Sequence, residues 1–337
     1  NIYTDDTRYD VTNIPCPYPG LNPYTDENAQ YFAGRDNLIE ECIKRLTPAG
    51  HEQILFCVYG ASGSGKSSFV RAGLVPSLKQ YYQKKRIVVH DFYVTPRKSP
   101  RSELIQVLQP IYGDFDADTT IQVCFDRIIN NSSKDIINIL VIDQGEELFT
   151  QSDDQECQEM LSILTNLPTF NQLRTFIIMT FRADFLANLY AHQTIYEQVI
   201  KKGLDLRAMT EEEIQQAILK PLEGSNKLFE LLLVEELAQV TAQQPSFLPL
   251  LQMTLLDIWQ TGKLWLKTKR LLSDSLVNHA NKSLNQVSRE FNINEKEIIE
   301  LLAELVDIHD DPRLDARRYR NMVDLETLIP NASKILD

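Results

Sequence analysis

The sequence predicts an α/β protein: a parallel sheet built around a glycine-rich loop, followed by a mainly helical C-terminal part. Three observations predict this fold. Apolar strand patterns alternate with helix patterns through residues 49–208, a glycine-rich loop follows the first of these strands, and helix patterns dominate from residue 209 onward. Such alternation is typical of a parallel sheet whose strands are joined by crossover helices. We expect an N-terminal arm with short helices in residues 1–48, the α/β core in 49–208, a helical domain in 209–272 and a winged-helix domain in 273–337.

The glycine-rich loop is the strongest motif in the chain. Residues 60–67 read GASGSGKS and fit G-x-x-x-x-G-K-[ST], with a buried strand pattern at 54–59 before it and a helix pattern at 68–74 after it. In such a loop, backbone N–H groups and the helix N-terminus hold phosphate oxygens. We therefore expect nucleotide binding, with Lys66 on the β- and γ-phosphates and Ser67 on Mg²⁺. The expected nucleotide-binding residues of the loop are Gly60, Ser62, Gly63, Ser64, Gly65, Lys66, Ser67 and Ser68.

The other elements follow in chain order. A Pro- and Tyr-rich arm fills residues 1–23, and helix patterns begin near 25–27 and span 37–46. Strand patterns at 87–93, 136–142, 175–181 and 204–206 extend the sheet, with helices expected at 102–111, 119–130 and 153–167. Helices at 210–219, 228–241 and 248–259 form the helical domain. Helices at 276–291 and 294–305, with a β-like tail that contains Arg313, Arg317, Arg318 and Arg320, predict the winged helix.

Composition narrows the class of protein. The chain has 337 residues, 43% of them hydrophobic, and a net charge of −13, which predicts a globular protein of two or three domains. The negative charge disfavours nucleic acid or an anionic membrane as the main partner. No apolar run has membrane-spanning length, no signal peptide opens the chain and the five cysteines lack a C-x-x-C motif, so we expect a cytoplasmic protein with reduced thiols. Because the first residue is Asn1, we expect this segment to belong to a longer protein.

A carboxylate at the end of a second strand completes the predicted site. Residues 139–142 are apolar and lead into Asp143, which we expect to hold Mg²⁺ directly or through water. Gln144 occupies the place where many P-loop ATPases carry a glutamate, so Glu146 and Glu147 are the candidate bases for hydrolysis. The alternative is that both glutamates only begin the next, solvated helix.

Arg182 ends another strand pattern, at residues 175–181. An arginine at the carboxyl end of such a strand points into the crevice where ligands bind, and it can sense or neutralise the γ-phosphate. The alternative is a salt bridge with Asp184. No guanine-reading N-K-x-D motif occurs in the core, which favours ATP and ADP over guanine nucleotides.

Together these residues resemble the STAND class of P-loop NTPases, which is close to the AAA+ lineage, and more narrowly the bacterial novel STAND family. The resemblance rests on residues 17–21 (PYPGL), 32–36 (FAGRD), 60–67, 141–149 (VIDQGEELF), 181–186 (FRADFL) and 247–252 (FLPLLQ). Ala33 and Gly145 stand where the family usually has aromatic residues. The related NACHT proteins carry acids three and four residues after the aspartate that corresponds to Asp143 (the Walker B Asp), and these acids match Glu146 and Glu147.

The resemblance implies contacts and a function. It implies that Gly34 and Arg35 lie near the adenine and that Pro249 touches the base or ribose. It also implies a switch in bacterial defence or regulated cell death: a closed ADP form exchanges for ATP, releases the winged helix and forms a homo-oligomer. An effector domain and a sensor domain in the full-length chain and an unidentified trigger are further implied partners. Ile308-His309-Asp310 is similar to the M-H-D motif of plant and animal relatives, with an exposed turn as the alternative.

Other functions remain open at this point. An AAA+-like motor would need an arginine finger from a neighbouring subunit and sustained hydrolysis, and the chain has no evident pore-loop pattern. A winged-helix transcription regulator is permitted by the tail arginines but disfavoured by the net charge of −13. A small-molecule kinase would have no use for the helical and winged segments. For a switch we expect slow ATP hydrolysis, because Gln144 replaces the usual adjacent base.

Overall fold

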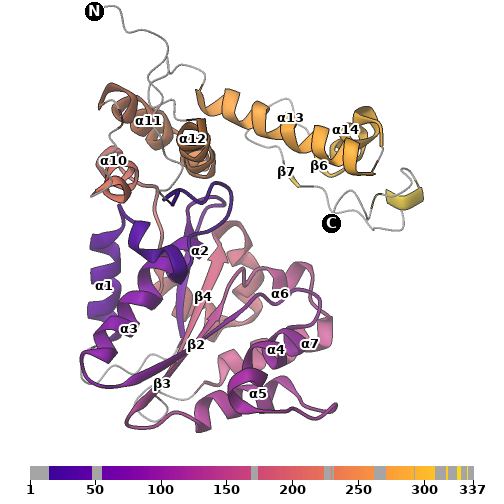
Figure 1. Ribbon diagram of the computed structural model, residues 1–337. Helices are drawn as coiled ribbons and strands as arrows, with labels where there is room; N and C mark the ends of the chain where they lie inside the picture. The colour runs from indigo at the N-terminus through magenta and orange to yellow at the C-terminus, as the bar shows by residue number, and fades with distance from the viewer. Residues whose placement is uncertain are drawn as a thin grey trace, which may run out of the picture. The chain divides into compact units, whose positions relative to one another are not determined.

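The protein is described by a computed structural model, drawn in Figure 1. The structure describes residues 15–47, 55–167, 174–223, 229, 231–261, 271–291, 293–307, 316–317, 325–327 and 332. The chain forms two compact units, Asn1–Lys269 and Arg270–Asp337, which are described here one at a time.

The first unit is built on a five-stranded sheet in the order β2-β3-β4-β1-β5. All neighbouring strands are parallel. The strands are β1 (Leu55–Gly60), β2 (Val88–Val94), β3 (Ile136–Ile142), β4 (Thr175–Arg182) and β5 (Leu204–Asp205). The predicted α/β fold is confirmed, because each apolar run of the core forms a strand of this sheet. Near-continuous apolar sequences suit central parallel strands, since both of their faces are covered.

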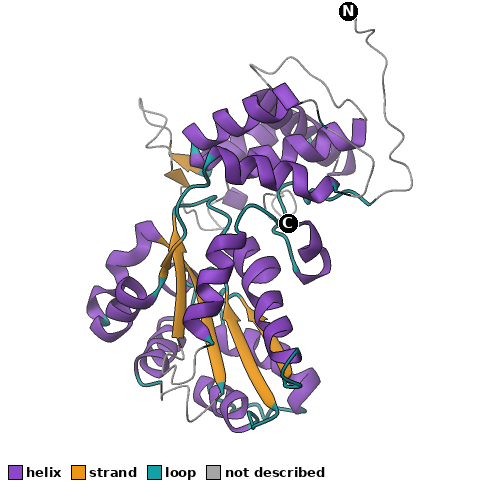
Figure 2. Ribbon diagram, turned by 90° about the vertical axis from the view of Figure 1, so that its left-hand side faces the viewer, coloured by secondary structure: helices purple, strands orange, loops and turns teal. Residues whose placement is uncertain are grey.

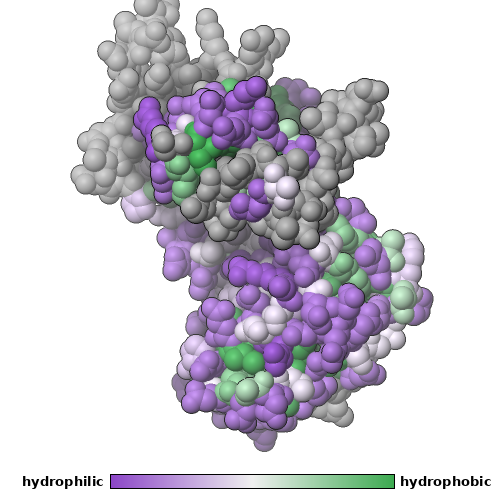
Figure 3. All heavy atoms as spheres, turned by 90° about the vertical axis from the view of Figure 1, so that its right-hand side faces the viewer, coloured by the Kyte–Doolittle hydropathy of each residue, from purple (hydrophilic) through white to green (hydrophobic). Residues whose placement is uncertain are grey.

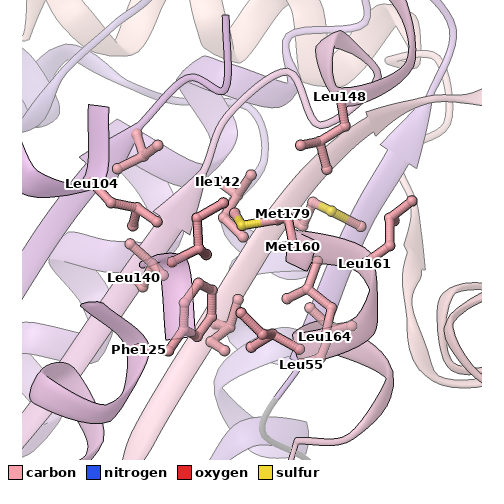
Figure 4. Close-up of a cluster of buried hydrophobic side chains, with 14 of the residues drawn as sticks. Leu55, Leu104, Phe125, Leu140, Ile142, Leu148, Met160, Leu161, Leu164 and Met179 are labelled. Carbon is pink, nitrogen blue, oxygen red and sulfur yellow. The ribbon is translucent and has the colours of Figure 1, made fainter. Parts of the chain in front are cut away.

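Successive side chains of each strand point to opposite faces of the sheet and enter two separate cores. The core in Figure 4 contains Leu55 of β1, Leu140 and Ile142 of β3, and Met179 of β4. The opposite core takes the alternate positions of the same strands, such as Phe56, Val58, Ile139, Val141 and Ile178. Helices cover both faces of the sheet (Figure 2).

Helices on the face of Figure 4 are α4 (Pro100–Tyr112), α5 (Ile121–Asn130), α7 (Asp154–Thr165), η3 (Ala183–Ala191) and α9 (Gln193–Lys202). The other face carries α1 (Asp36–Leu46), η2 (Phe69–Leu74) and α3 (Val75–Gln83). Side-chain caps start several of them; the Thr120 hydroxyl accepts from the Val123 N–H at 3.3 Å, for example. The sequence analysis missed η3 and α9, although Ile195 and Val199, four residues apart, are both buried on one face of α9.

The N-terminal arm packs against the helices that follow the core, α10 to α12, which are called the helical segment below. This region contains η1 (Asp26–Tyr31), α10 (Glu211–Leu219), η4 (Lys220–Leu222), α11 (Leu231–Gln243), η5 (Pro245–Phe247) and α12 (Leu248–Thr261). Tyr18 is buried, its hydroxyl donates to the Ile218 carbonyl at 2.6 Å, and its ring lies 6.3 Å from that of Trp259. The described part of the arm is therefore anchored on the helical segment by its aromatic residues.

The second unit contains α13 (Leu271–Phe291), α14 (Glu295–Glu304) and an antiparallel pair of short strands, β6 (Val306–Asp307) and β7 (Ala316–Arg317). Leu301, Leu325 and Ala332 form a small buried cluster. A winged helix stays a prediction for this unit. Ile308-His309-Asp310 and the arginines at 313, 318 and 320 lie outside the described residues.

Where Figure 3 colours the surface by hydropathy, hydrophilic residues predominate and hydrophobic areas are small. Within the described ranges, no helix combines the length and the apolar character needed to cross a membrane.

Candidate nucleotide-binding site

The phosphate loop connects β1 to the short helix α2 (Lys66–Ser68). Gly63 and Gly65 have φ angles of 75° and 86°, which only glycine adopts without strain, and Gly65 is the residue that caps α2. The Lys66 ammonium donates to the carbonyls of Gly60 and Ala61 at 3.1 and 2.7 Å. Burial lowers the pKa of Lys66, and the nearby Glu146 carboxylate opposes that shift. The predicted order of strand, loop and helix is present, and the Lys66 ammonium is hydrogen-bonded to the loop itself.

Asp143 lies beside this loop because β3 ends there. Its carboxylate is almost fully buried, and its Oδ1 accepts from the Ser67 and Thr180 hydroxyls at 2.8 and 2.7 Å. Its Oδ2 accepts from Arg71 Nε at 3.0 Å. The structure thus brings together the two predicted Mg²⁺ ligands and adds Thr180 and Arg71, which the sequence analysis did not name. Arg71 could have been found, because residues four apart on a helix share a face and Ser67 was already assigned.

The chemistry of Ser67 and Asp143 fits Mg²⁺. A hydroxyl and a carboxylate are the hard oxygen ligands this ion takes, and Mg²⁺ is usually held by one or two protein groups together with phosphates and water. No cluster of three or more His, Cys, Asp or Glu side chains able to hold a metal occurs within the part of the chain that the structure describes. Bound there with a nucleotide, Mg²⁺ would neutralise phosphate charge.

The two candidate bases differ in their surroundings. Glu146 is buried and its Oε2 accepts from the Arg182 backbone N–H at 3.2 Å. Burial raises the pKa of Glu146, and hydrogen bonds from backbone N–H groups and the charges of Lys66 and Arg182 oppose the rise. Burial likewise raises the pKa of Glu147, but the main opposing influence there is a backbone hydrogen bond at Arg97. Glu146 is therefore the glutamate on the Lys66 side.

Gln144 directly follows Asp143, and its backbone has an unusual conformation. Its φ angle is 57°, in the region that non-glycine residues seldom adopt, and its N–H donates to the Thr180 hydroxyl at 2.8 Å. The Thr180 hydroxyl thus accepts from Gln144 and donates to Asp143. This bridge fixes the end of β3 against β4, while the Gln144 side chain is exposed.

Arg182 lies at the end of β4, as its strand pattern predicts. Its guanidinium makes a fork with the Asp184 carboxylate, with Nε–Oδ1 and Nη2–Oδ2 distances of 3.1 and 2.6 Å. It also lies 5.2 Å from the centre of the Phe185 ring. The salt bridge weighed as the alternative is therefore present, and contact with a γ-phosphate would require Arg182 to leave or share Asp184.

A small pocket lies on the other side of the loop. It is lined by Arg35, Ser64, Ala208, Met209, Ile214, Thr241 and Leu248, which come from the core and from the helical segment. Three atoms of these residues, Arg35 Nη1, Ser64 Oγ and Thr241 Oγ1, are buried without a hydrogen-bond partner among the described residues. The pocket therefore presents polar atoms that only a ligand or water would satisfy.

Arg35 is the charged residue of that pocket. It is 3% exposed, its Nη2 donates to the Arg207 carbonyl at 2.8 Å, and its Nη1 lies 3.7 Å from Glu213 Oε2. Burial lowers the pKa of Arg35 to about 10, while the Glu213 charge opposes the shift. A guanidinium with one buried, unbonded N–H group is a donor available to a ligand acceptor.

Gly34 and Pro249 show how closely the helical segment approaches the loop. A Cβ at Gly34, where φ is +84°, would lie 2.2 Å from the Glu213 carbonyl oxygen of α10. A Cβ at Gly63 would lie 3.5 Å from the Pro249 ring. Of the remaining predicted residues, Ser68 accepts a hydrogen bond from the Tyr24 N–H at 3.1 Å and Ser62 is exposed at the loop.

Solved structures similar to this chain are P-loop ATPases of the AAA+ type. The Aeropyrum pernix ORC1 protein in complex with DNA has a TM-score of 0.57 at 16% identity, over 94% of this chain and 86% of that one. The Aeropyrum pernix ORC2 protein, in ADPNP-ADP complexes, has a TM-score of 0.54 at 13% identity, over 90% and 94% of the two chains. The Drosophila ORC bound to DNA has a TM-score of 0.51 at 13% identity, over 90% and 75%. At these identities the likeness concerns the fold.

A comparison with curated proteins found no match. The family model described as Novel STAND NTPase 1 matches residues 17–337, nearly the whole chain. That match includes the phosphate loop, Asp143 and the helical segment, and it confirms the resemblance drawn from the motifs. The chain belongs to the novel STAND NTPase 1 family.

Proposed function

We propose that the protein binds ATP and ADP with Mg²⁺ and acts as a nucleotide-dependent switch, with slow hydrolysis. The observation that carries the proposal is the pocket beside the loop, where Arg35, Ser64 and Thr241 present unbonded buried atoms. Leaving each such atom unsatisfied costs roughly 1–3 kcal/mol, so a ligand that bonds to them gains affinity. The pocket holds only about 10 Å³, room for one water molecule, so a base or ribose could reach these atoms only if the helical segment moves outward, with the phosphates on the loop.

The pocket also supports a switch, because residues of two segments share it. Arg35 directly precedes α1 in the N-terminal region and Ser64 belongs to the core, whereas Thr241 and Leu248 belong to the helical segment. A ligand held by both segments favours the arrangement in which they are closed, by its difference in affinity for the closed and open forms. Exchange of ADP for ATP would then change how firmly the helical segment is held. Self-association, control of an effector in a longer chain, a role in bacterial defence and a cytoplasmic location extend this proposal from the family resemblance.

Titration calorimetry with ADP, ATP and GDP tests the binding. We expect micromolar or tighter binding of ADP and ATP and weaker binding of GDP. Replacing Arg35 by Met should weaken ADP about tenfold, because a buried charge-assisted donor is lost. Arg207→Met is the matched control: Arg207 bonds to the same Glu213 from the exposed side and lies outside the pocket lining, so this change should leave ADP affinity within about twofold. Equal effects of the two changes would remove Arg35 from the binding site.

Light scattering and hydrogen exchange test the switch. We expect a monomer with ADP, a larger species with an ATP analogue under activating conditions, and stronger ADP-dependent protection of α10 to α12 than an ATP analogue gives. Turnover above roughly 1 s⁻¹ would instead favour the motor.

DNA binding is the second candidate, because two of the similar structures are DNA complexes. The net charge of −13 weighs against it. Binding to a labelled duplex at low and physiological salt, in the presence of ATP, decides this point; tight binding that falls steeply with salt would favour a DNA-dependent ATPase.

A further inference from the structure

Arg71 is a cation placed directly on the carboxylate expected to serve Mg²⁺. Its Nε lies 3.0 Å from Asp143 Oδ2, and the side chains of the two residues are 26% and 4% exposed. A carboxylate this deeply buried is costly unless it is paired and hydrogen-bonded. Arg71 supplies the opposite charge, and the Ser67 and Thr180 hydroxyls supply the remaining hydrogen bonds.

The position of Arg71 is fixed by the fold. It lies in η2, a π-helical segment that continues directly from α2, four residues beyond Ser67. Its guanidinium lies 5.1 Å from the centre of the Tyr93 ring on β2, within the range of a cation–π interaction. Segments of π-helix inside α-helices are often found at functional sites.

This arrangement changes what Asp143 offers to a metal ion. Oδ1 already accepts two hydrogen bonds, from the Ser67 and Thr180 hydroxyls, and Oδ2 accepts one from Arg71. The Asp143–Arg71 pair also carries no net charge, so it attracts a dication far less than an unpaired carboxylate does. Most of the attraction for Mg²⁺ must then come from nucleotide phosphates.

We propose that Arg71 is the resident counter-ion of Asp143, competes with Mg²⁺ for that carboxylate and so limits how much Mg²⁺ strengthens nucleotide binding. This inference rests on the proposed nucleotide binding. Arg71 is a positioning residue, acting through Asp143 rather than on the nucleotide. The physical consequence of this competition is a weak coupling between Mg²⁺ binding and nucleotide binding, and such coupling is reciprocal.

The test measures ADP affinity with EDTA and with saturating Mg²⁺. The quantity compared is the dissociation constant in EDTA divided by that in Mg²⁺, which is the factor by which Mg²⁺ strengthens ADP binding. In wild-type protein we expect a ratio close to one. Arg71→Gln should raise the ratio about fivefold or more, the lower range of typical coupling between sites. Arg71→Lys is the matched control, because it keeps the positive charge and should leave the ratio within about twofold of wild type. An unchanged or lower ratio in Arg71→Gln would overturn the inference while leaving ADP binding itself intact.

A second measurement needs no nucleotide. Mg²⁺ alone should raise the melting temperature of Arg71→Gln and leave that of the wild-type protein nearly unchanged, because only the variant has an unpaired carboxylate for the ion.

If Arg71→Gln does not fold, Tyr93→Leu replaces it. This change removes the ring that contacts the guanidinium and should raise the ratio of dissociation constants less strongly, whereas Tyr93→Phe keeps the ring and should not raise the ratio. Equal ratios in both Tyr93 variants, or equal melting shifts in variant and wild type, contradict the inference. Failure of the wild-type protein to bind any nucleotide would overturn the proposed function and this inference with it.

Discussion

The two sides of the phosphate loop differ in how their polar atoms are satisfied. On the metal side, Asp143 accepts hydrogen bonds from Ser67, Thr180 and Arg71. On the base side, Arg35 and Thr241 keep buried polar atoms without a hydrogen-bond partner among the described residues. On the proposed base side, polar atoms are left without partners, whereas Asp143 on the proposed metal side would have to exchange partners before an ion could bind it directly. Under the proposed function, this difference would separate recognition of the nucleotide from recognition of the metal.

The largest expected effect comes from the residue that serves both sides. Lys66→Ala should abolish ATP and ADP binding, because the loop would lose its cation for the terminal phosphates. Calorimetry measures the loss. Lys79→Ala is the control, since Lys79 pairs with Asp91 at 2.7 Å on α3 and β2 and should not affect the loop. Unchanged ADP affinity in Lys66→Ala would mean that neither side of the loop is a nucleotide site.

Glu146→Gln should lower ATP turnover about a hundredfold and leave ADP affinity near that of the wild-type protein, because the amide cannot accept a proton from water. Single-turnover hydrolysis measures the effect. Glu147→Gln is the comparison, and we expect a smaller loss, since Glu147 faces Arg97 rather than Lys66. A larger loss in Glu147→Gln would reverse the assignment.

The same Glu146 variant has a pH signature. Burial raises the pKa of Glu146 above the usual 4.5, so the native state binds this proton more tightly than the unfolded chain does. The stability that Glu146 contributes is therefore greatest below pH 4.5 and is lost as the pH rises through the native pKa. Glu146→Gln should remove that loss and make the nucleotide-free protein more stable than wild type at pH 7, as measured by urea unfolding. Parallel pH profiles of the two proteins would show that Glu146 is not perturbed.

Asp143→Asn sharpens the contrast on the metal side. Introduced into the Arg71→Gln variant, the change should remove the gain in ADP affinity that Mg²⁺ gives that variant and leave the affinity in EDTA nearly unchanged, because an amide is a poorer Mg²⁺ ligand than a carboxylate. Introduced alone, it leaves Arg71 without its partner charge and should make the protein less stable. Asp91→Asn, which breaks the half-buried pair with Lys79, is the control. A double variant that keeps the Mg²⁺-dependent gain would place Asp143 outside the metal site.

The smallest effect distinguishes two similar buried hydroxyls on the helical segment. Thr241 Oγ1 and Thr254 Oγ1 both lack a hydrogen-bond partner among the described residues, but only Thr241 lines the pocket. Replacing either by Val should stabilise the nucleotide-free protein, by up to about 1 kcal/mol, because an unsatisfied hydroxyl is removed. Only Thr241→Val should also lower the affinity for ADP, by about threefold. If both variants bind ADP equally well, Thr241 does not contact the ligand.

Much of the core could be predicted from local pattern. The apolar runs leading to Gly60, Asp143 and Arg182 became neighbouring strands β1, β3 and β4, and parallel strands place such residues at one edge of the sheet. Pro249, which the family resemblance places at the base or ribose, lies close to the loop, since a Cβ at Gly63 would be 3.5 Å from its ring; its contact with a nucleotide stays a prediction. The pattern failed at η3 and α9, where helices that cover the sheet have mixed polar and aromatic sequences.

By itself, the sequence determined the family, the phosphate loop, the strand that ends in Asp143 and the α/β fold, because these depend on residue type and on short periodic spacing. Only the tertiary structure decided the partners of these residues. It placed Arg71 and Thr180 on Asp143, and Arg35 beside Ser64 and Thr241. Such contacts join residues tens to hundreds of positions apart, and they depend on strand order and on how the helical segment packs. No local pattern encodes that information.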